Sequence, residues 1–244
     1  MAGDDKDATL SVGVWRGDAD GGEYVEYSVP HRASQTVLDV VTWIQRNIAP
    51  DLAYRFACRV GMCGSCAMTV NGRPRWTCRT HVDKVARNGR LTIAPLDNLP
   101  VVRDLAADMA PFFEKWKRAN GAFQGGETRD DPIAEVRPDE PERKEADAAI
   151  ECINCGICYA ACDSVRWNPD YLGPAALNRV WALHNDRRDV ARDDRLAAIG
   201  GEGGCHLCHS QAGCTAHCPQ GLDPSGGIAG LKRALFRAAL KGTV

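Results

Sequence analysis

Twelve cysteines constrain this 244-residue chain more than any other feature, because they fall into three groups of four. The groups occupy residues 58–78, 152–162 and 205–218. The opening residues, "MAGDDKDATL", are acidic and polar, so we expect no signal peptide and a reducing compartment for the thiols. Clustered cysteines in such a compartment hold metal more often than they form disulfides. The cysteine pattern therefore predicts a chain folded around metal centres.

The first group has the spacing Cys-x4-Cys-x2-Cys, followed by a fourth cysteine after eleven intervening residues. This is the plant-type ligand pattern of a two-iron cluster. A loop around a small anionic cluster must turn backbone N–H groups inward, and Gly61 and Gly64 allow the backbone angles that this requires. A zinc ribbon is the alternative, but zinc usually takes two Cys-x2-Cys pairs and this group has one. We therefore predict a [2Fe-2S] cluster on Cys58, Cys63, Cys66 and Cys78.

The second group has the bacterial spacing Cys-x2-Cys-x2-Cys-x3-Cys, in which the fourth cysteine binds the other of two clusters. The third group supplies a partner run, with Gln211 in place of its middle cysteine and Pro219 after its last cysteine. Exchanging the fourth cysteines predicts one set of four thiolates, which suits a [4Fe-4S] cluster, and one set of three, which suits a [3Fe-4S] cluster. The four-iron ligands are Cys152, Cys155, Cys158 and Cys218, and the three-iron ligands are Cys162, Cys208 and Cys214.

This assignment leaves Cys205 without a cluster. The favoured interpretation is a spare thiol beside the glycine-rich "GGEGG" turn. The alternative is that Cys205 completes a fourth corner of the three-iron cluster or replaces Cys208 as a ligand. A zinc site in "CHLCH", using His206 and His209, is a third possibility, but it would dismantle the second ferredoxin run.

Hydrophobic periodicity predicts strands mainly in the first half of the chain and helices mainly in the second. The expected strands are residues 10–15, 22–30, 67–78, which form a hairpin around Asn71-Gly72, and 90–96. The expected helices are residues 36–48, capped by Ser34 or Thr36, then 175–189 and 226–240. An α+β chain follows from this distribution.

An acidic stretch with three prolines, residues 127–147, separates the first two cysteine groups. Its composition is typical of a linker or an extended crossing segment. We therefore expect a [2Fe-2S] domain over residues 1–120, a linker over 121–146, and a domain with the other two clusters over 147–244.

Five stretches together carry a resemblance to a known family. They are "CRVGMCGSCAMTVNGRPRWTC", "PVVRDLAADMAPFFEKW", "ECINCGICYAAC", "WNPDYLGPAALNRVWALHNDRRD" and "CHSQAGCTAHCPQGLDP". In this order the chain resembles, over nearly its whole length, the iron–sulfur subunits of succinate dehydrogenase and fumarate reductase. The resemblance implies a β-grasp, plant-type ferredoxin domain followed by an all-α, bacterial-type ferredoxin domain.

The resemblance also implies a function and partners. Electrons would pass singly from the FAD of a separate flavoprotein subunit through the [2Fe-2S], [4Fe-4S] and [3Fe-4S] clusters to a membrane quinone. The dicarboxylate site would lie in the flavoprotein, so we expect no catalytic residue in this chain, which also lacks a glycine-rich dinucleotide motif. Membrane anchor subunits would hold the protein at the cytoplasmic face of a bacterial membrane. The complex would take part in the tricarboxylic acid cycle and the respiratory chain.

Other functional classes fit less well. The net charge of -2 argues against non-specific nucleic-acid binding, and the sequence has no apolar run near the length of a membrane span. A fumarate reductase that runs the same architecture in reverse and a free, soluble polyferredoxin remain as alternatives.

At the quinone end, the resemblance implies roles for Trp167 in "WNPD" and for His209, with Ser164 and Asp163 nearby. Asp163 stands where the family usually has proline, and Arg166 stands where it often has an aromatic residue. Our hypothesis is that these two charges reshape the quinone pocket or its proton supply. A solvated ion pair at a helix end is an equally good interpretation.

The last expected helix is amphipathic. Its apolar stripe (Ile228, Leu231, Leu235, Ala238) predicts a core face, and its basic residues (Lys232, Arg233, Arg237, Lys241) predict a solvated face. We expect some contact between this helix and an anchor subunit or lipid headgroups.

Overall fold

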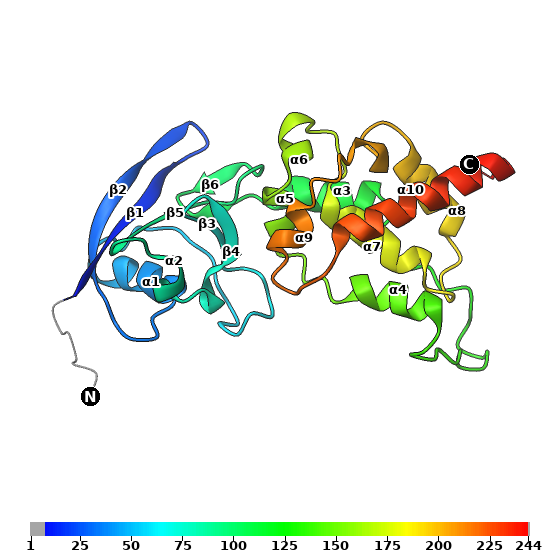
Figure 1. Ribbon diagram of the computed structural model, residues 1–244, viewed down its shortest axis with the longest axis horizontal. Helices are drawn as coiled ribbons and strands as arrows, with labels where there is room; N and C mark the ends of the chain where they lie inside the picture. Colours follow the sequence, from blue (N-terminus) through cyan, green and yellow to red (C-terminus); the bar gives the residue numbers. More distant parts are fainter. Residues whose placement is uncertain (1–7, 244) are drawn as a thin grey trace. The chain divides into compact units, whose positions relative to one another are not determined.

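The computed structural model describes residues 8–243, so most of the acidic opening stretch, and with it the signal-peptide prediction, lies outside the described residues. Contacts divide the chain into two units (Figure 1). Unit 1 runs to Met109 and includes Cys155–Ile157, and unit 2 comprises Ala110–Asn154 and Cys158–Val244. Strands build unit 1 and helices build unit 2, as expected of an α+β chain.

Unit 1 contains a five-stranded sheet with the strand order β2-β1-β5-β3-β4. Its strands are β1 (Thr9–Asp18), β2 (Gly21–Pro30), β3 (Ala67–Val70), β4 (Arg73–Trp76) and β5 (Arg90–Ala94). The β1–β5 pair is parallel, whereas the other three pairs are antiparallel. A small second sheet pairs β6 (Val101–Arg103) with β7 (Ala106–Ala107). All the strands expected from the sequence are therefore present.

The β3–β4 hairpin connects Cys66 to Cys78, the last cysteine of the first group. Asn71 and Gly72 both have positive φ values, 48° and 71°, which suit the tight turn that the Asn-Gly pair predicts. The return strand was expected to reach Cys78, but it ends at Trp76. The backbone N–H and hydroxyl of Thr77 both donate to the carbonyl of Cys66, at 3.1 and 2.8 Å. This turns the chain into a short 3-10 helix, η1 (Thr77–Arg79), which holds Cys78.

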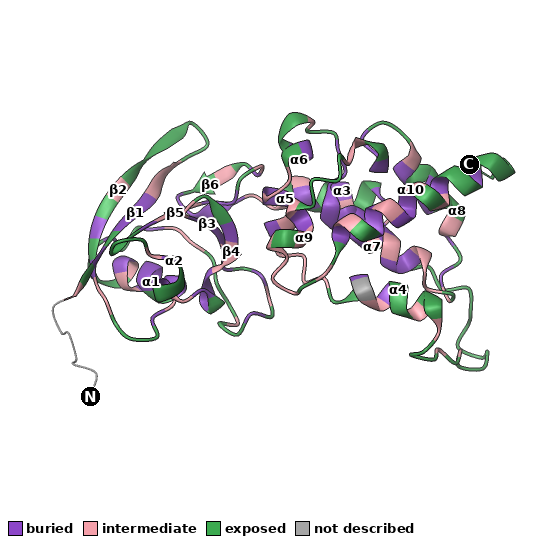
Figure 2. Ribbon diagram, viewed as in Figure 1, coloured by how far each residue is buried: buried purple, intermediate pink, exposed green. Residues whose placement is uncertain are grey.

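Helix α1 (Val37–Asn47) covers the sheet with one apolar face. Thr36 is its N-cap in a capping box with Asp39, which confirms one of the two expected caps. Val37, Val40, Val41 and Ile44 are buried among valines of β1 and β2. Figure 2 shows the buried parts of α1 in purple. Ile48 was expected on this face, but it is exposed because the helix ends before it. The short helix α2 (Val82–Val85) completes this side of the core.

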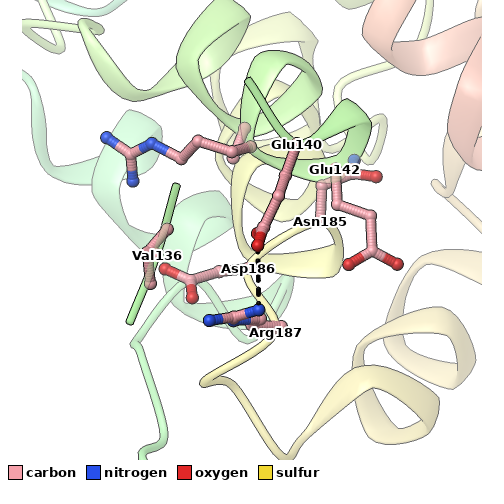
Figure 3. Close-up of a pocket in the computed structure, with 8 residues that line it drawn as sticks. Val136, Glu140, Glu142, Asn185, Asp186 and Arg187 are labelled. Atoms are coloured by element: carbon pink, nitrogen blue, oxygen red, sulfur yellow. Dashed lines mark hydrogen bonds and ion pairs between the residues drawn. The ribbon is translucent and has the colours of Figure 1, made fainter. Parts of the chain in front are cut away.

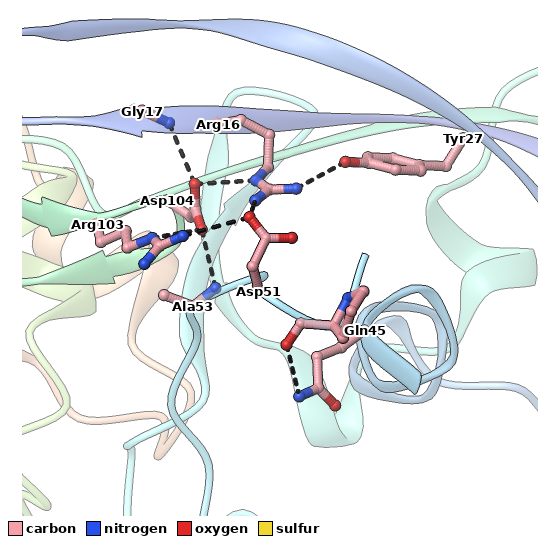
Figure 4. Close-up of polar contacts among 9 residues, drawn as sticks. Arg16, Gly17, Tyr27, Gln45, Asp51, Ala53, Arg103 and Asp104 are labelled. Carbon is pink, nitrogen blue, oxygen red and sulfur yellow. Dashed lines mark hydrogen bonds and ion pairs between the residues drawn. The ribbon is translucent and has the colours of Figure 1, made fainter. Parts of the chain in front are cut away.

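An arginine–aspartate network orders the chain that leads to the first cysteine group (Figure 4). Arg16 donates through Nε to Asp104 at 2.9 Å and through a terminal nitrogen to Asp51 at 2.6 Å. The buried Asp104 carboxylate also accepts the backbone N–H groups of Gly17 and Ala53. The network therefore fixes residues 51–53, which enter the loop that begins at Cys58.

Unit 2 packs around helix α7 (Pro174–His184), which contacts four other helices. These are α3 (Ala110–Arg118), α4 (Pro141–Ile150), α8 (Arg192–Gly200) and α10 (Pro224–Lys241). Shorter helical segments lie among the cysteines, namely α5 (Ile157–Ala160), α6 (Asp163–Trp167), η2 (Cys205–Leu207) and α9 (Gly213–His217). Among residues 8–243, no helix combines the length and the apolar character needed to cross a membrane.

Helix α10 follows the expected amphipathic pattern. Its predicted stripe, Ile228, Leu231, Leu235 and Ala238, is buried. Gly227 and Gly230 lie against the indole of Trp181 on α7, and a Cβ atom at Gly230 would collide with that ring. The close approach of the two helices therefore depends on glycine at this position.

The helix expected over residues 175–189 ends at His184, five residues early. The side-chain amide of Asn185 donates a hydrogen bond to the carbonyl of Trp181 at 2.9 Å. Arg188 forms an ion pair with Asp186 instead of continuing the helix. Figure 3 shows the small pocket that follows, which is lined mainly by charged residues and where Arg187 donates to Glu140 at 3.1 Å. Glu140 lies within the expected linker 121–146, and α4 begins one residue later, at Pro141.

A fully buried ion pair anchors the chain that follows α3. The side chains of Arg195 and Asp189 both have no exposed surface. Arg195 also donates to the backbone carbonyls of Asn120 and Ala122, while Asp189 accepts the N–H of Gln124 at 3.0 Å. Residues 120–124 are therefore fixed to unit 2. The contact division, after Met109, falls earlier than the expected domain end at residue 120 because α3 packs with unit 2.

Candidate iron–sulfur sites

The first cysteine loop turns backbone N–H groups toward its sulfur atoms. Cys58 Sγ accepts the N–H groups of Val60 and Met62, at 3.4 and 3.3 Å. Cys63 Sγ accepts the N–H of Cys58 at 3.5 Å. Hydrogen bonds of this kind stabilise anionic sulfur and set the potential of a bound cluster. The loop therefore fits an anionic iron–sulfur centre.

Glycine gives this loop its shape. Gly61 and Gly64 have φ values of 78° and 71°, a region that side chains rarely adopt. A Cβ atom at Gly64 would stand 2.5 Å from the Cβ of Cys155, which the contacts group with unit 1. The close approach of backbone and ligand residue thus requires glycine.

The thiols of the first group differ in acidity. The pKa of Cys63 is lowered to about 6 by hydrogen bonds from Ser65 and Cys58. The pKa of Cys78 is raised to about 11, mainly by burial and further by Cys66. A cluster binds thiolates, so Cys78 must lose its proton when the cluster assembles. Cys63 ionises more easily because its pKa is lowered.

The second group lies on a loop and helix α5, and two of its residues have positive φ, Asn154 (52°) and Gly156 (79°). Burial raises the pKa of Cys152, and the negative charge of Cys218 raises it further. Cys152 and Cys218, 66 positions apart in sequence, are thus electrostatic neighbours.

The remaining cysteines meet elsewhere in unit 2. Cys162 is the N-cap residue of α6, and the Ser164 hydroxyl donates to its sulfur. Burial raises the pKa of Cys162, and the charge of Cys208 adds to this effect. Burial likewise raises the pKa of Cys214 to about 11, and the charges of Cys162 and Cys208 contribute. Cys162, Cys208 and Cys214 therefore lie close enough for their charges to interact.

Cys205 is completely buried in η2. Burial raises its pKa, the charge of Lys232 opposes this, and the charge of Cys208 adds a smaller increase. The Lys232 ammonium donates to the backbone carbonyl of Cys208 at 2.7 Å. A buried thiol suits both interpretations of Cys205, the spare thiol and the extra ligand.

The residues expected at the quinone end differ in exposure. Trp167, the last residue of α6, is 64% exposed, and His209 and Asp163 are also exposed. Ser164 is buried against Cys162. Within residues 8–243, none of the ion pairs joins Asp163 to Arg166.

Sequence reasoning missed two residues beside the third site. Tyr171 is buried, and its pKa is raised by burial and by the charges of Cys208 and Cys162. Lys115 on α3 is buried as well, and its ammonium lies over the ring of Tyr159. Tyr171 follows the "WNPD" motif closely enough to have been noticed, but no local signal marks Lys115 as buried.

Family models match both halves of the chain. Residues 10–114 match a 2Fe-2S iron-sulfur cluster binding domain, and residues 151–223 match a 4Fe-4S dicluster domain. These matches cover the first cysteine group and the second and third groups, respectively.

Curated relatives and a solved structure agree with the family models. The fumarate reductase iron-sulfur subunit of Haemophilus influenzae is 33% identical over 215 residues, covering 83% of this chain and 82% of the relative. The succinate dehydrogenase iron-sulfur subunit of Paracoccus denitrificans is 36% identical over 227 residues, covering 91% and 86%. A chain of the Mycobacterium smegmatis Sdh1 complex in the apo form matches with a TM-score of 0.83 and 30% identity, over 96% of this chain and 97% of that chain.

Cysteine spacing, fold and comparisons agree, and the resemblance stated from the sequence is confirmed. The chain belongs to the iron–sulfur subunits of the succinate dehydrogenase and fumarate reductase family, and it serves electron transfer through [2Fe-2S] and [4Fe-4S] centres.

Proposed function

We propose that this chain carries electrons singly from the FAD of a partner flavoprotein, through [2Fe-2S], [4Fe-4S] and [3Fe-4S] clusters, to a membrane quinone. One observation carries the proposal. The charge of Cys218, the last cysteine of the third group, interacts with Cys152 in the second group. The charge of Cys162, the last cysteine of the second group, interacts instead with Cys208 and Cys214. These charge effects support the exchange of fourth ligands that a two-cluster ferredoxin unit requires.

The ligand sets follow from this exchange. The [2Fe-2S] cluster is assigned to Cys58, Cys63, Cys66 and Cys78, the [4Fe-4S] cluster to Cys152, Cys155, Cys158 and Cys218, and the [3Fe-4S] cluster to Cys162, Cys208 and Cys214. The clusters supply one-electron redox chemistry, and the chain supplies the surroundings that tune it. Its backbone N–H groups donate to the Cys58 sulfur, and the Ser164 hydroxyl donates to the sulfur of Cys162.

The dicarboxylate site is assigned to the flavoprotein, as an oxidoreductase complex of this family requires. Two large apolar residues of the first cysteine loop support a docking surface there, because Val60 is 58% and Met62 is 66% exposed. Apolar residues of this size are seldom exposed together unless a partner covers them. Succinate oxidation is the proposed direction, and fumarate reduction, named for several relatives, is the alternative.

The quinone end is assigned to α6 and the segment after Cys208. The exposed Trp167 and His209 would face the quinone, with Ser164 and Asp163 beside them. Asp163→Pro tests whether the unusual carboxylate matters, because unchanged quinone reduction and an unchanged cluster potential would remove it from the site. Anchor subunits would hold the protein at the cytoplasmic face of a bacterial membrane. The exposed Phe236 and Leu240 among the basic residues of α10 support such a contact.

The three-part division of the chain stands as part of this proposal. Residues 1–120 would form the ferredoxin-type domain, 121–146 the linker, and 147–244 the α-helical ferredoxin domain. Limited proteolysis of the complex would test it, with cleavage expected between residues 125 and 140, where the chain is exposed.

The decisive experiment is low-temperature EPR of the purified complex, oxidised and then reduced with dithionite, with iron and zinc measured on the same sample. We expect an oxidised three-iron signal that disappears on reduction, a reduced two-iron signal, and iron sufficient for one cluster of each kind without zinc. A second cubane in place of the three-iron signal would contradict the assignment and make Cys205 its fourth ligand. A chain that purifies without a flavoprotein, with all clusters intact, would favour the free polyferredoxin.

The variant Cys205→Ala separates the two interpretations of that thiol. If Cys205 is a spare thiol, the variant keeps the oxidised three-iron signal and the parent iron content. If Cys205 is a ligand, the signal at this site is lost or altered while the two-iron signal remains.

A further inference from the structure

Lys115 is a buried cation in a helix whose other lysine is exposed. Only 7% of the residue surface of Lys115 is exposed. Lys117, two positions later on α3, has a side chain that is 69% exposed and is paired with Glu114 at 2.6 Å. A buried ammonium group is costly unless an opposite charge or an aromatic ring compensates it. The position of Lys115 therefore calls for a compensating group.

Part of the compensation comes from Tyr159. The Lys115 ammonium lies 4.9 Å from the centre of the Tyr159 ring, a cation–π geometry. Phe112, on the same helix, packs edge-to-face on that ring at 5.6 Å. Tyr159 is buried in α5, between Cys158 and Cys162. Two contacts thus fix α3, and with it the Lys115 charge, beside the segment that joins these cysteines.

The missing opposite charge points to the third cysteine site. No ion pair among the residues that the structure describes includes Lys115. Burial and the nearby Arg118 lower the pKa of Lys115, whereas the negative charges of Asp170 and Cys162 favour its protonated form. A cluster bound to Cys162 would place a permanent anionic centre where the chain itself supplies only these two charges.

We propose that Lys115 is the counter-charge of the cluster held by Cys162, Cys208 and Cys214, and that it makes this cluster easier to reduce. The inference rests on the proposed function, which assigns a cluster to these thiols. Reduction adds one electron to the cluster and breaks no bond, so its charge becomes more negative by one. Lys115 keeps its proton in both states, and its attraction is stronger for the reduced state because the site is buried. The charge therefore favours arrival of the electron.

Redox titration of the purified complex, followed by EPR, tests the inference with the variant Lys115→Gln. We expect the reduction equilibrium of this cluster to weaken about tenfold, which corresponds to a midpoint lower by about 59 mV for one electron. The variant Lys115→Arg keeps the charge and should stay near the parent midpoint. Lys117→Gln removes an exposed charge from the same helix and should leave the midpoint unchanged. The two-iron midpoint should not move in any variant.

Equal midpoints in the parent and in Lys115→Gln would overturn the inference and leave the proposed function intact. If the parent shows a second cubane at this site, the proposed three-iron centre is wrong, and Lys115→Gln is compared with Lys117→Gln on the midpoint of that cubane. If Lys115→Gln fails to assemble, Lys115→Met provides a second neutral variant. Loss of this cluster alone in both neutral variants, with retention in Lys115→Arg, supports the counter-charge, whereas loss in Lys115→Arg as well contradicts it.

Discussion

Replacing Asp189 by Asn removes the negative charge from the buried ion pair with Arg195 while preserving the shape of the side chain. Neither side chain has exposed surface, so the guanidinium cannot recover its lost partner by reaching water. Breaking a buried pair by removing one partner costs about 3–5 kcal/mol. A protein of this size loses about 2–4 °C in melting temperature per kcal/mol. We therefore expect Asp189→Asn to melt on the order of 10 °C below the parent.

Thermal unfolding of the purified complex, followed by the loss of cluster absorbance, measures this effect. The double variant Asp189→Leu with Arg195→Met separates the charge from the packing, because a buried pair replaced by apolar residues of similar volume is often no less stable. It should therefore recover most of the loss, apart from the hydrogen bonds that Arg195 donates to Asn120 and Ala122 and those that Asp189 accepts from Gln124 and Ala191. A fall of less than about 2 °C in Asp189→Asn would refute the assignment of a large uncompensated charge to Arg195.

Three further predictions follow from local geometry. Asp223 caps α10, and hydrogen bonds, first from Thr215, hold the pKa of its carboxyl below the usual value. The charge of Asp223 therefore stabilises the folded state above pH about 4, and this stabilisation is lost as the pH falls through the lowered pKa. Asp223→Asn, which can still cap, should therefore differ from the parent in urea midpoint at pH 7 and match it in acid, and an equal difference at both pH values would contradict this. Gly230→Ala should lose about 1–3 kcal/mol in urea unfolding by crowding the α7 tryptophan, whereas Gly201→Ala, where a Cβ meets nothing within 4 Å, serves as its control. Gly64→Ala should lose the reduced two-iron EPR signal, because its Cβ would collide with Cys155 and displace the loop that holds the two-iron ligands. Gly72→Ala, at the same φ of 71° but in open space, should keep the signal.

Features that depend on neighbouring residues were predictable from the sequence. Cysteine spacing predicted the cluster loops because a cluster fixes the distances between its ligands. Alternating valines predicted β1 and β2, and the Asn71-Gly72 pair predicted the hairpin turn. In each case the residues that decide the structure lie within one short segment.

Features that depend on distant residues were not predictable. Arg195 is buried because it donates to the backbone carbonyls of Asn120 and Ala122, 75 and 73 positions earlier in the sequence. The contact division falls before α3 because Phe112 packs on Tyr159, 47 positions later in the sequence. No pattern within α3 signals that contact.

The two ends of the proposed electron path stabilise anionic sulfur by different means. The first loop uses its own backbone, since Val60 and Met62 donate to Cys58 within the same turn. In our proposal the third site uses cations from distant helices: the Lys115 ammonium of α3, which lies over the Tyr159 ring, and the Lys232 ammonium of α10, which donates to the backbone carbonyl of Cys208. Backbone donors are inseparable from the loop, so changing the loop should prevent cluster assembly. The lysines are separable from the ligands, so changing them should shift the potential of a cluster that still assembles. Evolution can therefore adjust the third centre without altering a cysteine.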